Sequence, residues 1–545
     1  MKSLEKMVIY QIYPKSFQDS NDDGIGDIRG IIQHIDYFVE LGIDMIWMNP
    51  IFVSPQKDNG YDITHYTKID PIFGTMEDLE ELIEKLEIHD IGLMFDMVFN
   101  HSSTTHPWFQ QALAGNKKYE DFYIIRPPKD SGDLPTNWAS KFGGPAWAPF
   151  GDSGKYYLHL YDPSQADLNW RNENMRNELY DIVDFWMDKG IKGFRFDVLN
   201  VIGKDEILVD STGSIDQEKS LYTDTPVVHD YIREMNRKTF GHREITTVGE
   251  MSSTNIQNSI EYTKKENDQL DMIFSFHHLK VDYKDGDKWT LMDFDFLKLK
   301  EILFQWQLGM EKGNGWMALF WNNHDQPRSN HRFGDTKNYP YEVATMLAHC
   351  LHMMRGTPYI YQGEEFGMVG PHFKTITDYR DVESKNAYER LIKDHRHEEA
   401  MAIIAAKSRD DSRTPMQWDH GEKYYGFSKE KPWIMPADDG ISLKRDRKNK
   451  NSIFQFYKDL IAIRKSEPII QSGKIKPILV DHPRIFGYIR SNGEDEIIVL
   501  NNFYPEPVEI QWDLPSDEKI IGNGPLKKLT DTICLEPYEC GSWKI

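Results

Sequence analysis

The sequence predicts an α/β fold in which one parallel sheet carries most of the chain. Short apolar segments alternate with helical patterns over most of the 545 residues. An irregular stretch interrupts this alternation after the third apolar segment, and the last part of the chain changes to short alternating strands. This order is typical of a closed (β/α)8 barrel or of a doubly wound sheet, and spacing alone does not choose between them.

Eight apolar segments are expected to form the strands of this sheet. They are Val8–Gln11, Met45–Met48, Leu93–Val98, Gly193–Val198, Thr246–Gly249, Met272–Phe276, Met317–Trp321 and Pro358–Tyr361. Ile31, Ile32, Ile35 and Phe38 recur at helical spacing and predict one helix that ends at Leu41 and Gly42. A second helix is predicted around Met76–Glu87.

Composition divides the chain into further parts. Residues 1–100 and 171–470 carry the strand and helix pattern, whereas residues 101–170 are rich in Gly, Pro, Trp, Asp and Asn and predict a small inserted domain. Residues 363–431, after the eighth strand, are predicted to form a long irregular loop. Residues 471–545 predict a C-terminal β-domain, with strands at Ile485–Ile489, Glu496–Leu500 and Val508–Trp512.

The charge and cysteine content limit the possible partners and location. A net charge of −23 argues against nucleic acid as a partner and means that an anionic substrate needs a local basic pocket. No segment approaches the ~18 apolar residues of a membrane span, and the first residues lack the pattern of a signal peptide. Three cysteines, Cys350, Cys534 and Cys540, have no metal-site spacing and fit a reducing cytoplasm. We expect a cytoplasmic monomer.

Charged side chains follow several predicted strands at their carboxyl ends, which form the active face of a barrel. Side chains alternate along a strand, so Arg195 and Asp197 face one side, and the guanidinium is expected to keep the pKa of the Asp197 carboxyl low. An isolated Arg-x-Asp pair is more often a structural ion pair. Glu250 closes an apolar strand, where partial desolvation suits a general acid, although an ordinary rim carboxylate is the alternative.

Two further clusters are expected on the same face. Asp96, Asn100 and His101 follow the third strand, and Asn323, His324 and Asp325 follow the seventh. Each cluster alone is weak and could simply brace a loop. Together, carboxyls from several strands match glycoside hydrolysis, which needs one acid/base and one nucleophile or base beside the bond.

In order, the four stretches Asp96–His101, Gly193–Asp197, Val248–Glu250 and Asn323–Asp325 resemble the motif regions of the α-amylase family of glycoside hydrolases. The resemblance implies a (β/α)8 TIM barrel, an inserted domain after strand 3 and a C-terminal antiparallel β-sandwich. It also implies a retaining double displacement, with catalytic residues Asp197 as nucleophile, Glu250 as acid/base and Asp325 as the residue that grips and distorts the sugar. It places the substrate-binding residues His101, Arg195 and His324 in the same subsite.

Two loops resemble those that close the glucose pocket of exo-acting members of the family. In Gln56–Asp62, the resemblance implies that Asp58 binds the outer hydroxyls and that Tyr61 stacks on the ring. Ser408–Pro415 resembles the arginine-bearing loop of the same clamp, in which Arg409 is favoured over Arg413 as the sugar contact. Val198 directly follows Asp197, and a valine at this position resembles the branch of the family that acts on α-1,6 and related links.

Within the family, Phe274–Tyr283 resembles the phospho-α-1,1-glucosidases, which implies α,α-trehalose 6-phosphate as the substrate and glucose with glucose 6-phosphate as the products. His277, Lys280, Lys284 and Lys288 are candidate phosphate ligands, or else a solvated charged loop. Lys288 is the weakest, since the non-phosphate relatives share it. Three alternatives stay open: an oligo-1,6-glucosidase acting on isomaltose-type ends, a transglucosylase, and a catalytically inactive binding barrel.

Asp19–Asp27 reads D-x-N-x-D-G-x-x-D, close to a calcium loop with alternating oxygen ligands but without the distal glutamate of an EF-hand. The resemblance implies a structural Ca²⁺, with Mg²⁺ as the alternative, held by Asp19, Asn21, Asp23, Asp27 and the Ile25 carbonyl. The other reading is a polar turn without an ion. No organic cofactor is expected.

Overall fold

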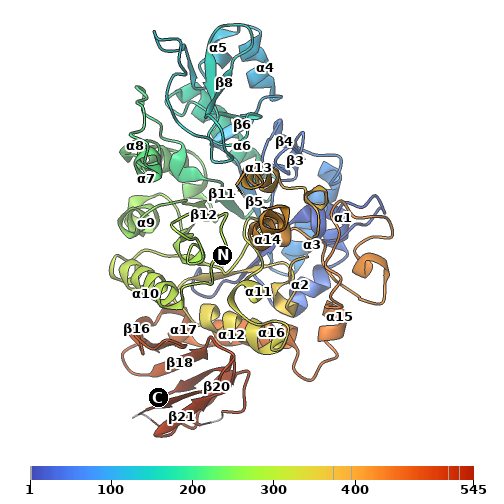
Figure 1. Ribbon diagram of the computed structural model, residues 1–545, viewed down its shortest axis with the longest axis vertical. Helices are drawn as coiled ribbons and strands as arrows, with labels where there is room; N and C mark the ends of the chain where they lie inside the picture. Colours follow the sequence, from blue (N-terminus) through green and yellow to red (C-terminus); the bar gives the residue numbers. More distant parts are fainter. Residues whose placement is uncertain (1–2, 372, 395, 513–514, 527) are drawn as a thin grey trace.

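The computed structural model describes residues 3–371, 373–394, 396–512, 515–526 and 528–545. Eight parallel strands form one sheet in the order β13-β12-β11-β5-β2-β1-β15-β14, and a parallel bridge between Ile273 and Met317 joins its two ends. The sheet is therefore a closed barrel, which excludes the doubly wound alternative and confirms the predicted (β/α)8 fold (Figure 1). Its strands are β1 Ile9–Ile12, β2 Met45–Met48, β5 Gly92–Met97, β11 Gly193–Phe196, β12 Thr246–Glu250, β13 Met272–Phe274, β14 Ala318–Leu319 and β15 Thr357–Tyr361.

All eight predicted strands exist, but three of them end two residues before their predicted ends. The strand predicted over Met317–Trp321 is only Ala318–Leu319, because the Phe320 carbonyl accepts from the His278 ring and the Trp321 indole donates to the Leu347 carbonyl. Strand β13 ends at Phe274 and β11 at Phe196. An apolar run in the sequence thus predicts which residues are buried better than it predicts which residues pair in the sheet.

Helices surround the barrel, and their apolar faces explain why they form. In α3, Met76–Ile88, Thr75 and Asp78 make a capping box, and Leu79, Leu82, Ile83 and Leu86 are buried at helical spacing. The other principal helices around the barrel are α2 Ile35–Leu41, α6 Glu173–Asp188, α8 Pro226–Lys238, α9 Ile256–Thr263, α10 Phe296–Lys312, α12 Pro340–His352 and α16 Ile453–Ser466. Among the helices in the described ranges, none is long and apolar enough to cross a bilayer.

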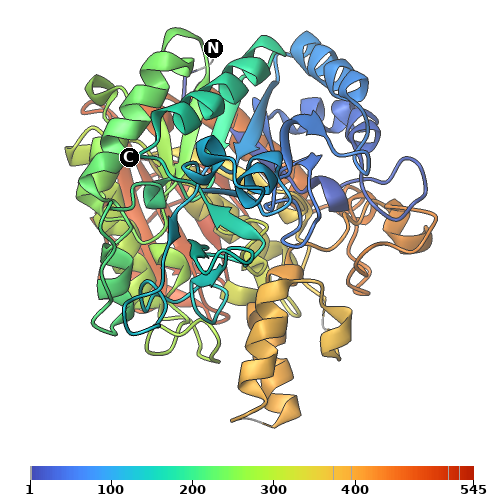
Figure 2. The ribbon, with the colours of Figure 1, turned by 90° about the horizontal axis from the view of Figure 1, so that it is seen from above.

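Two helical predictions need correction. The single helix predicted up to Gly42 is two helices, α1 Ile28–Ile32 and α2, because the backbone leaves helical geometry at His34, whose ring stacks on Trp418 with centroids 3.9 Å apart. The stretch 363–431, predicted as irregular, contains α13 Val382–Leu391 and α14 His397–Lys407. These two helices project from the body of the molecule (Figure 2).

Between β5 and β11 the chain forms a small, mostly antiparallel unit beside the barrel (Figure 1). Strand β6 pairs with β10, and β7, β9 and β8 form a three-stranded sheet. Its elements are β6 His101–Ser103, α4 Pro107–Leu113, α5 Lys117–Glu120, β7 Ile125–Arg126, β8 Trp147–Pro149, β9 Tyr156–Leu158 and β10 Gln165–Asp167. Because β6 begins right after β5, this unit is tied to the carboxyl end of a barrel strand.

The C-terminal part is a pair of antiparallel sheets. The larger has the order β16-β17-β18-β22-β20 and the smaller pairs β19 with β21. Side chains of both sheets, including Ile498, Val508, Ile533 and Trp543, share one buried apolar cluster, as in a sandwich. The strands are β16 Lys474–Ile478, β17 Ile485–Ser491, β18 Glu496–Asn502, β19 Val508–Gln511, β20 Lys519–Gly522, β21 Thr532–Leu535 and β22 Cys540–Lys544.

A buried ion pair joins the inserted unit to the barrel. The Lys204 ammonium lies 2.9 Å from a carboxylate oxygen of Asp167, at the end of β10, and both side chains are 1% exposed. Asn100, just after β5, bonds both Lys204 and Asp167. Removing the lysine would leave a buried carboxylate without its countercharge, which is far costlier than losing a surface pair.

We therefore expect Lys204→Met to lower the free energy of unfolding by about 3–5 kcal/mol. Urea denaturation of the variant and of the native chain measures this loss. Lys118→Met is the matched control, because its pair with Glu178 is 3.1 Å long but 49% and 40% exposed; the expected loss there is below about 1 kcal/mol. Similar losses in both variants would contradict a special role for the buried pair.

Candidate active site

The barrel brings charged side chains to the carboxyl ends of adjacent strands. Asp96 lies in β5, Arg195 in β11 and Glu250 at the end of β12, and the register places Arg195 beside Asp96. The backbone N–H of Asp197, the residue after β11, donates to the Met97 carbonyl at 2.9 Å. Strand pairing therefore fixes these side chains before any loop contributes.

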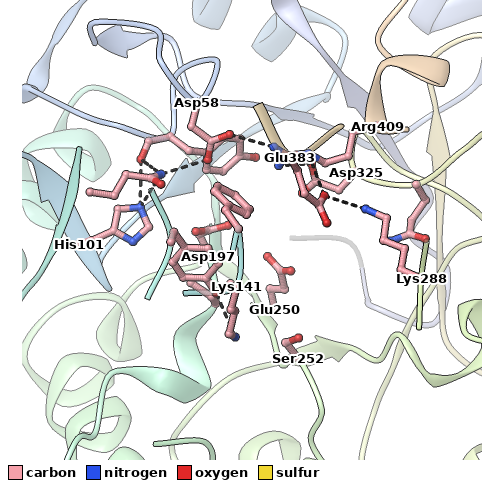
Figure 3. A pocket seen from close by; sticks show the side chains of 16 residues that line it. Asp58, His101, Lys141, Asp197, Glu250, Ser252, Lys288, Asp325, Glu383 and Arg409 are labelled. Atoms are coloured by element: carbon pink, nitrogen blue, oxygen red, sulfur yellow. Dashed lines mark hydrogen bonds and ion pairs between the residues drawn. The ribbon is translucent and has the colours of Figure 1, made fainter. Parts of the chain in front are cut away.

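A pocket opens at this face (Figure 3). Most of its lining is charged or aromatic, and it takes side chains from the barrel, the inserted unit and the segment after β15. The lining residues are Asp58, Tyr61, His101, Lys141, Phe142, Tyr161, Gln165, Asp197, Val198, Glu250, Ser252, Lys288, Asp325, Gln326, Glu383 and Arg409. The structure thus brings Asp197, Glu250 and Asp325 together, as the sequence analysis expected of its three acids.

One buried guanidinium holds three carboxyls from three strands. Arg195, 1% exposed, lies 2.6 Å from Asp96 and 2.7 Å from Asp197, and its other terminal nitrogen donates to Glu250. Asp197 and Glu250 therefore meet on neighbouring nitrogens of a single planar group. This geometry suits two carboxyls that must act on the same atom, as a retaining glycosidase requires at a separation of ~5–5.5 Å.

The expectation of a low pKa for the Asp197 carboxyl was wrong. Burial raises its pKa well above the usual range, Arg195 opposes this rise, and the neighbouring carboxyls of Glu250 and Asp96 add to it. Burial likewise raises the pKa of Asp96 to about 6 against the effect of Arg195. One positive charge therefore faces three carboxyls, and burial together with the neighbouring carboxyls favours the protonated form of Asp197 and of Asp96.

Asp325 lies in a second arginine clamp. Its carboxylate is 2.6 Å from Arg413 and 3.3 Å from Arg409. Burial alone would raise the pKa of Asp325, but His324 and the two guanidinium groups hold it well below its usual range. The His324 ring is fully buried behind Tyr61, with centroids 5.3 Å apart, so it braces the pocket and does not line it. Asp325 is thus a permanent carboxylate, suited to accept hydrogen bonds from hydroxyls.

The closed end of the pocket is a network around Asp58. Arg409 donates to Asp58 at 3.1 Å and to Asp381 at 2.6 Å, and Gln165 donates to the other Asp58 oxygen at 3.1 Å. His101 lies 3.2 Å from Gln165. Burial raises the pKa of Asp58 to about 6, although Arg409 opposes this. Arg409 lines the pocket, whereas Arg413 is outside the lining and bonds Asp325 and the His324 carbonyl.

Several lining residues carried no sequence signal. Glu383 falls in the segment predicted to be irregular, as does Asp381, which does not line the pocket but accepts a hydrogen bond from Arg409. Lys141 and Gln165 lie in the inserted unit, where no periodic pattern exists. Their positions depend on how two loops far apart in the sequence fold over the barrel mouth. Only a recognised motif around each residue could have indicated them.

Among the candidate phosphate ligands, the structure places only Lys288 in the pocket lining. Its ammonium lies 2.7 Å from Glu383, and although burial lowers the Lys288 pKa, Glu383 raises it above the usual value. The His277 ring bonds the Thr254 carbonyl at 2.6 Å and stacks on Trp306. Lys280 is half-buried and Lys284 exposed, both outside the lining. The candidate with the weakest sequence support is therefore the one that reaches the pocket.

The Asp19–Asp27 loop is wound by its own side chains. Asp19, Asn21 and Asp23 each accept the N–H two residues ahead, and Asp27 caps α1 through the Gly30 N–H. Gly24 has φ +89°, and a Cβ there would meet the Lys431 carbonyl at 2.3 Å, so only glycine fits. Within the described ranges, no three Asp, Glu, His or Cys side chains converge as a metal site. The oxygen-only donors suit a hard cation, and the ligand set remains a prediction.

Comparison with known proteins agrees with this geometry. The alpha amylase catalytic domain model matches residues 11–473. The chain is 48% identical to a trehalose-6-phosphate hydrolase of Bacillus subtilis over 98% of this chain and 97% of the relative, and 43% identical to an oligo-1,6-glucosidase of Bacillus cereus over 99% of both. The crystal structure of Bacillus licheniformis trehalose-6-phosphate hydrolase superposes with a TM-score of 0.95, at 48% identity over 99% of both chains.

The Asp58 carboxyl gives a testable pH dependence. With its pKa at about 6, Asp58 is ionised above that pH and protonated below it, so its binding of sugar hydroxyls weakens as the pH falls. The inhibition constant of glucose should be ~10-fold higher for Asp58→Asn than for the native enzyme at pH 7.5, and the ratio should approach one near pH 5. The ratio removes the effect of the Asp197–Glu250 pair, which both proteins share. A ratio independent of pH would show that Asp58 does not titrate in this range or does not bind the sugar.

Proposed function

The chain belongs to the α-amylase family of glycoside hydrolases, and we propose that it hydrolyses α,α-trehalose 6-phosphate to glucose and glucose 6-phosphate. The supporting observation is the convergence of Asp197, Glu250 and Asp325 in one pocket, in a chain that is 48% identical along its length to a trehalose-6-phosphate hydrolase. No catalytic carboxyl has been lost, which argues against an inactive binding barrel.

The proposed mechanism is a double displacement. Glu250 protonates the bridging oxygen while the Asp197 carboxylate attacks the anomeric carbon, so that the leaving sugar departs and a glucosyl ester forms. Glu250, now ionised, takes a proton from water, which attacks the same carbon and releases glucose with its original configuration. Arg195 contacts all three carboxyls and so offsets negative charge at each stage.

The closed end of the pocket supports an exo action. Asp58, Arg409 and Asp381 form a connected polar wall, and Tyr61 lines the pocket next to it. A terminal glucose held by this wall presents its anomeric carbon to Asp197. The Asp325 carboxylate accepts hydrogen bonds from the hydroxyls of that glucose. We propose that this wall excludes a longer chain beyond the terminal unit.

The second sugar must therefore lie on the open side, where Lys288 is available. In a protein of net charge −23, a phosphate needs local positive charge and donated hydrogen bonds. We propose that Lys288 supplies part of both. His277, Lys280 and Lys284, which lie outside the lining, act at most on a phosphate that extends beyond it.

A substrate panel tests the proposed function. We expect kcat/KM for trehalose 6-phosphate to exceed that for isomaltose by ~100-fold or more, as two charge-assisted contacts to the phosphate would give. Both activities are measured by glucose release with the same enzyme. A preference for isomaltose would replace the proposal with an oligo-1,6-glucosidase, and transfer to added sugar in place of glucose release would indicate a transglucosylase.

We also propose that the Asp19–Asp27 loop holds a structural Ca²⁺ or Mg²⁺. Support comes from its alternating oxygen donors and from its distance in sequence from the catalytic acids. The loop contacts the segment after β15 through Ser428, whose hydroxyl donates to Asp19 at 2.6 Å. An ion there would strengthen a junction between two distant parts of the chain.

Chelation tests the cation. Removal of a bound ion should lower the free energy of unfolding, by about 2.7 kcal/mol if the free ion had been at 100 times its Kd, and therefore lower Tm. Separate addition of Ca²⁺ and of Mg²⁺ should identify the ion that restores it. Asp23→Asn is the control in which the chelator should have a smaller effect. An unchanged melting curve in the native protein would exclude a stabilising ion.

The location and assembly follow as lesser proposals. All three cysteines are free, which is compatible with a reducing compartment, so we propose a cytoplasmic location. We also propose that the protein is a monomer.

A further inference from the structure

Lys141, from the inserted unit, projects into the side of the pocket. Its backbone N–H donates to the Leu160 carbonyl at 2.8 Å, which fixes the start of the side chain. The ammonium donates to the Tyr161 hydroxyl at 3.3 Å and lies 5.2 Å and 5.7 Å from the ring centroids of Tyr161 and Tyr222. Aromatic contacts of this kind position a cation without neutralising it.

Lys141 differs from the other cations around the pocket in its lack of a carboxylate partner. Lys288 pairs with Glu383 at 2.7 Å and Arg409 pairs with Asp381 at 2.6 Å. Among the residues that the structure describes, no carboxylate lies within ion-pair distance of Lys141. Burial lowers the pKa of Lys141 to about 8, as expected for an ammonium that has lost water without gaining an anion.

The position of Lys141 relates it to the leaving sugar. Glu250, which protonates the oxygen of that sugar, is among the charges that act on Lys141. In Figure 3, Lys141 and Lys288 lie to the two sides of Glu250, and Asp58 and Arg409 lie at the other end of the view. Lys141 and Phe142 also line an adjoining hollow, together with Glu383, Arg390 and Lys393. Lys141 is therefore on the open side, away from the terminal glucose.

The pocket lining carries more acidic than basic side chains, so an anionic substrate needs a cation in the pocket. Five acidic side chains line the pocket, namely Asp58, Asp197, Glu250, Asp325 and Glu383, against three basic ones, namely Lys141, Lys288 and Arg409. A phosphate of nearly two negative charges would be repelled by this excess. A basic group already paired to a carboxylate offers it only part of its charge, whereas an unpaired one offers all of it.

We propose that Lys141 is a specificity-determining residue, whose ammonium forms an ion pair with an anionic group on the leaving sugar. The inference rests on the proposed function, because the anion is the 6-phosphate. The inserted unit thus supplies, through Lys141, a positive charge for the phosphate of the substrate, in addition to that of Lys288. Binding of the dianion gives Lys141 the partner that the free enzyme lacks, and Tyr161 and Tyr222 hold the ammonium in place beforehand.

The experiment compares Lys141→Gln and Lys141→Arg with the native enzyme on trehalose 6-phosphate and on an uncharged aryl α-glucoside. For Lys141→Gln, the KM for the phosphorylated substrate should rise ~10- to 100-fold more than the KM for the aryl glucoside, as for the loss of one charge-assisted contact. Glucose 6-phosphate should weaken as an inhibitor of aryl glucoside hydrolysis by a similar factor. Lys141→Arg should recover a large part of both, because it keeps the charge.

Lys155→Gln is the matched control, since Lys155 is an exposed lysine of the same unit and does not line the pocket. It should leave both KM values unchanged, which separates a local contact from a loss of net charge. Equal changes on both substrates for Lys141→Gln, or no rescue by arginine, would overturn the inference. If the native enzyme itself does not prefer the phosphorylated substrate, the proposed function fails; if it does and Lys141→Gln retains that preference, only the assignment of Lys141 fails.

Discussion

The catalytic site depends on one constraint, the Arg195 guanidinium that holds Asp96, Asp197 and Glu250. Three carboxyls in such proximity, two buried and one partly buried, would repel one another, and each would be costly to remove from water alone. A planar cation with several donors can serve all three at once, which a lysine ammonium cannot do with the same geometry. Because the four residues come from adjacent strands of a closed barrel, the register of the sheet sets their relative positions.

Arginines also bind carboxylates at the closed end of the pocket, with a different effect on the pKa of the carboxyl. Arg409 and Arg413 converge on Asp325, and Arg409 also meets Asp58 and Asp381. Here positive charge keeps the Asp325 pKa low, whereas at Arg195 the surplus of carboxyls raises the Asp197 pKa. The ratio of arginines to carboxyls thus gives Asp325 a low pKa and Asp197 a raised one.

The sequence predicted those parts of the site that local patterns encode. Each catalytic acid ends or follows an apolar strand, so strand prediction and a recognised motif locate it together. Asp381, Glu383 and Lys141 escaped prediction because their segments have no period and reach the pocket only through long-range packing. The low pKa expected for Asp197 was wrong for a related reason. Arg195 lies two residues away in the sequence, whereas Glu250 and Asp96 come close to Asp197 only in the folded chain. In the Asp19–Asp27 loop, the oxygen-rich pattern was visible in the sequence, but the bonds of its side chains to the N–H groups of the same loop appear only in the folded chain.

The division between strand ends and loops has a consequence for substrate choice. Residues that carry the chemistry are fixed by the barrel, so a change of substrate need not disturb them. Lys141 and Lys288 lie on separate loops and Glu383 in the first turn of α13, outside the barrel strands, where a substitution alters charge without moving Asp197 or Glu250. This accounts physically for the high similarity of the chain both to a trehalose-6-phosphate hydrolase and to an oligo-1,6-glucosidase. The reaction follows from the parallel sheet, and the accepted leaving group follows from the few charges that surround the mouth of the pocket.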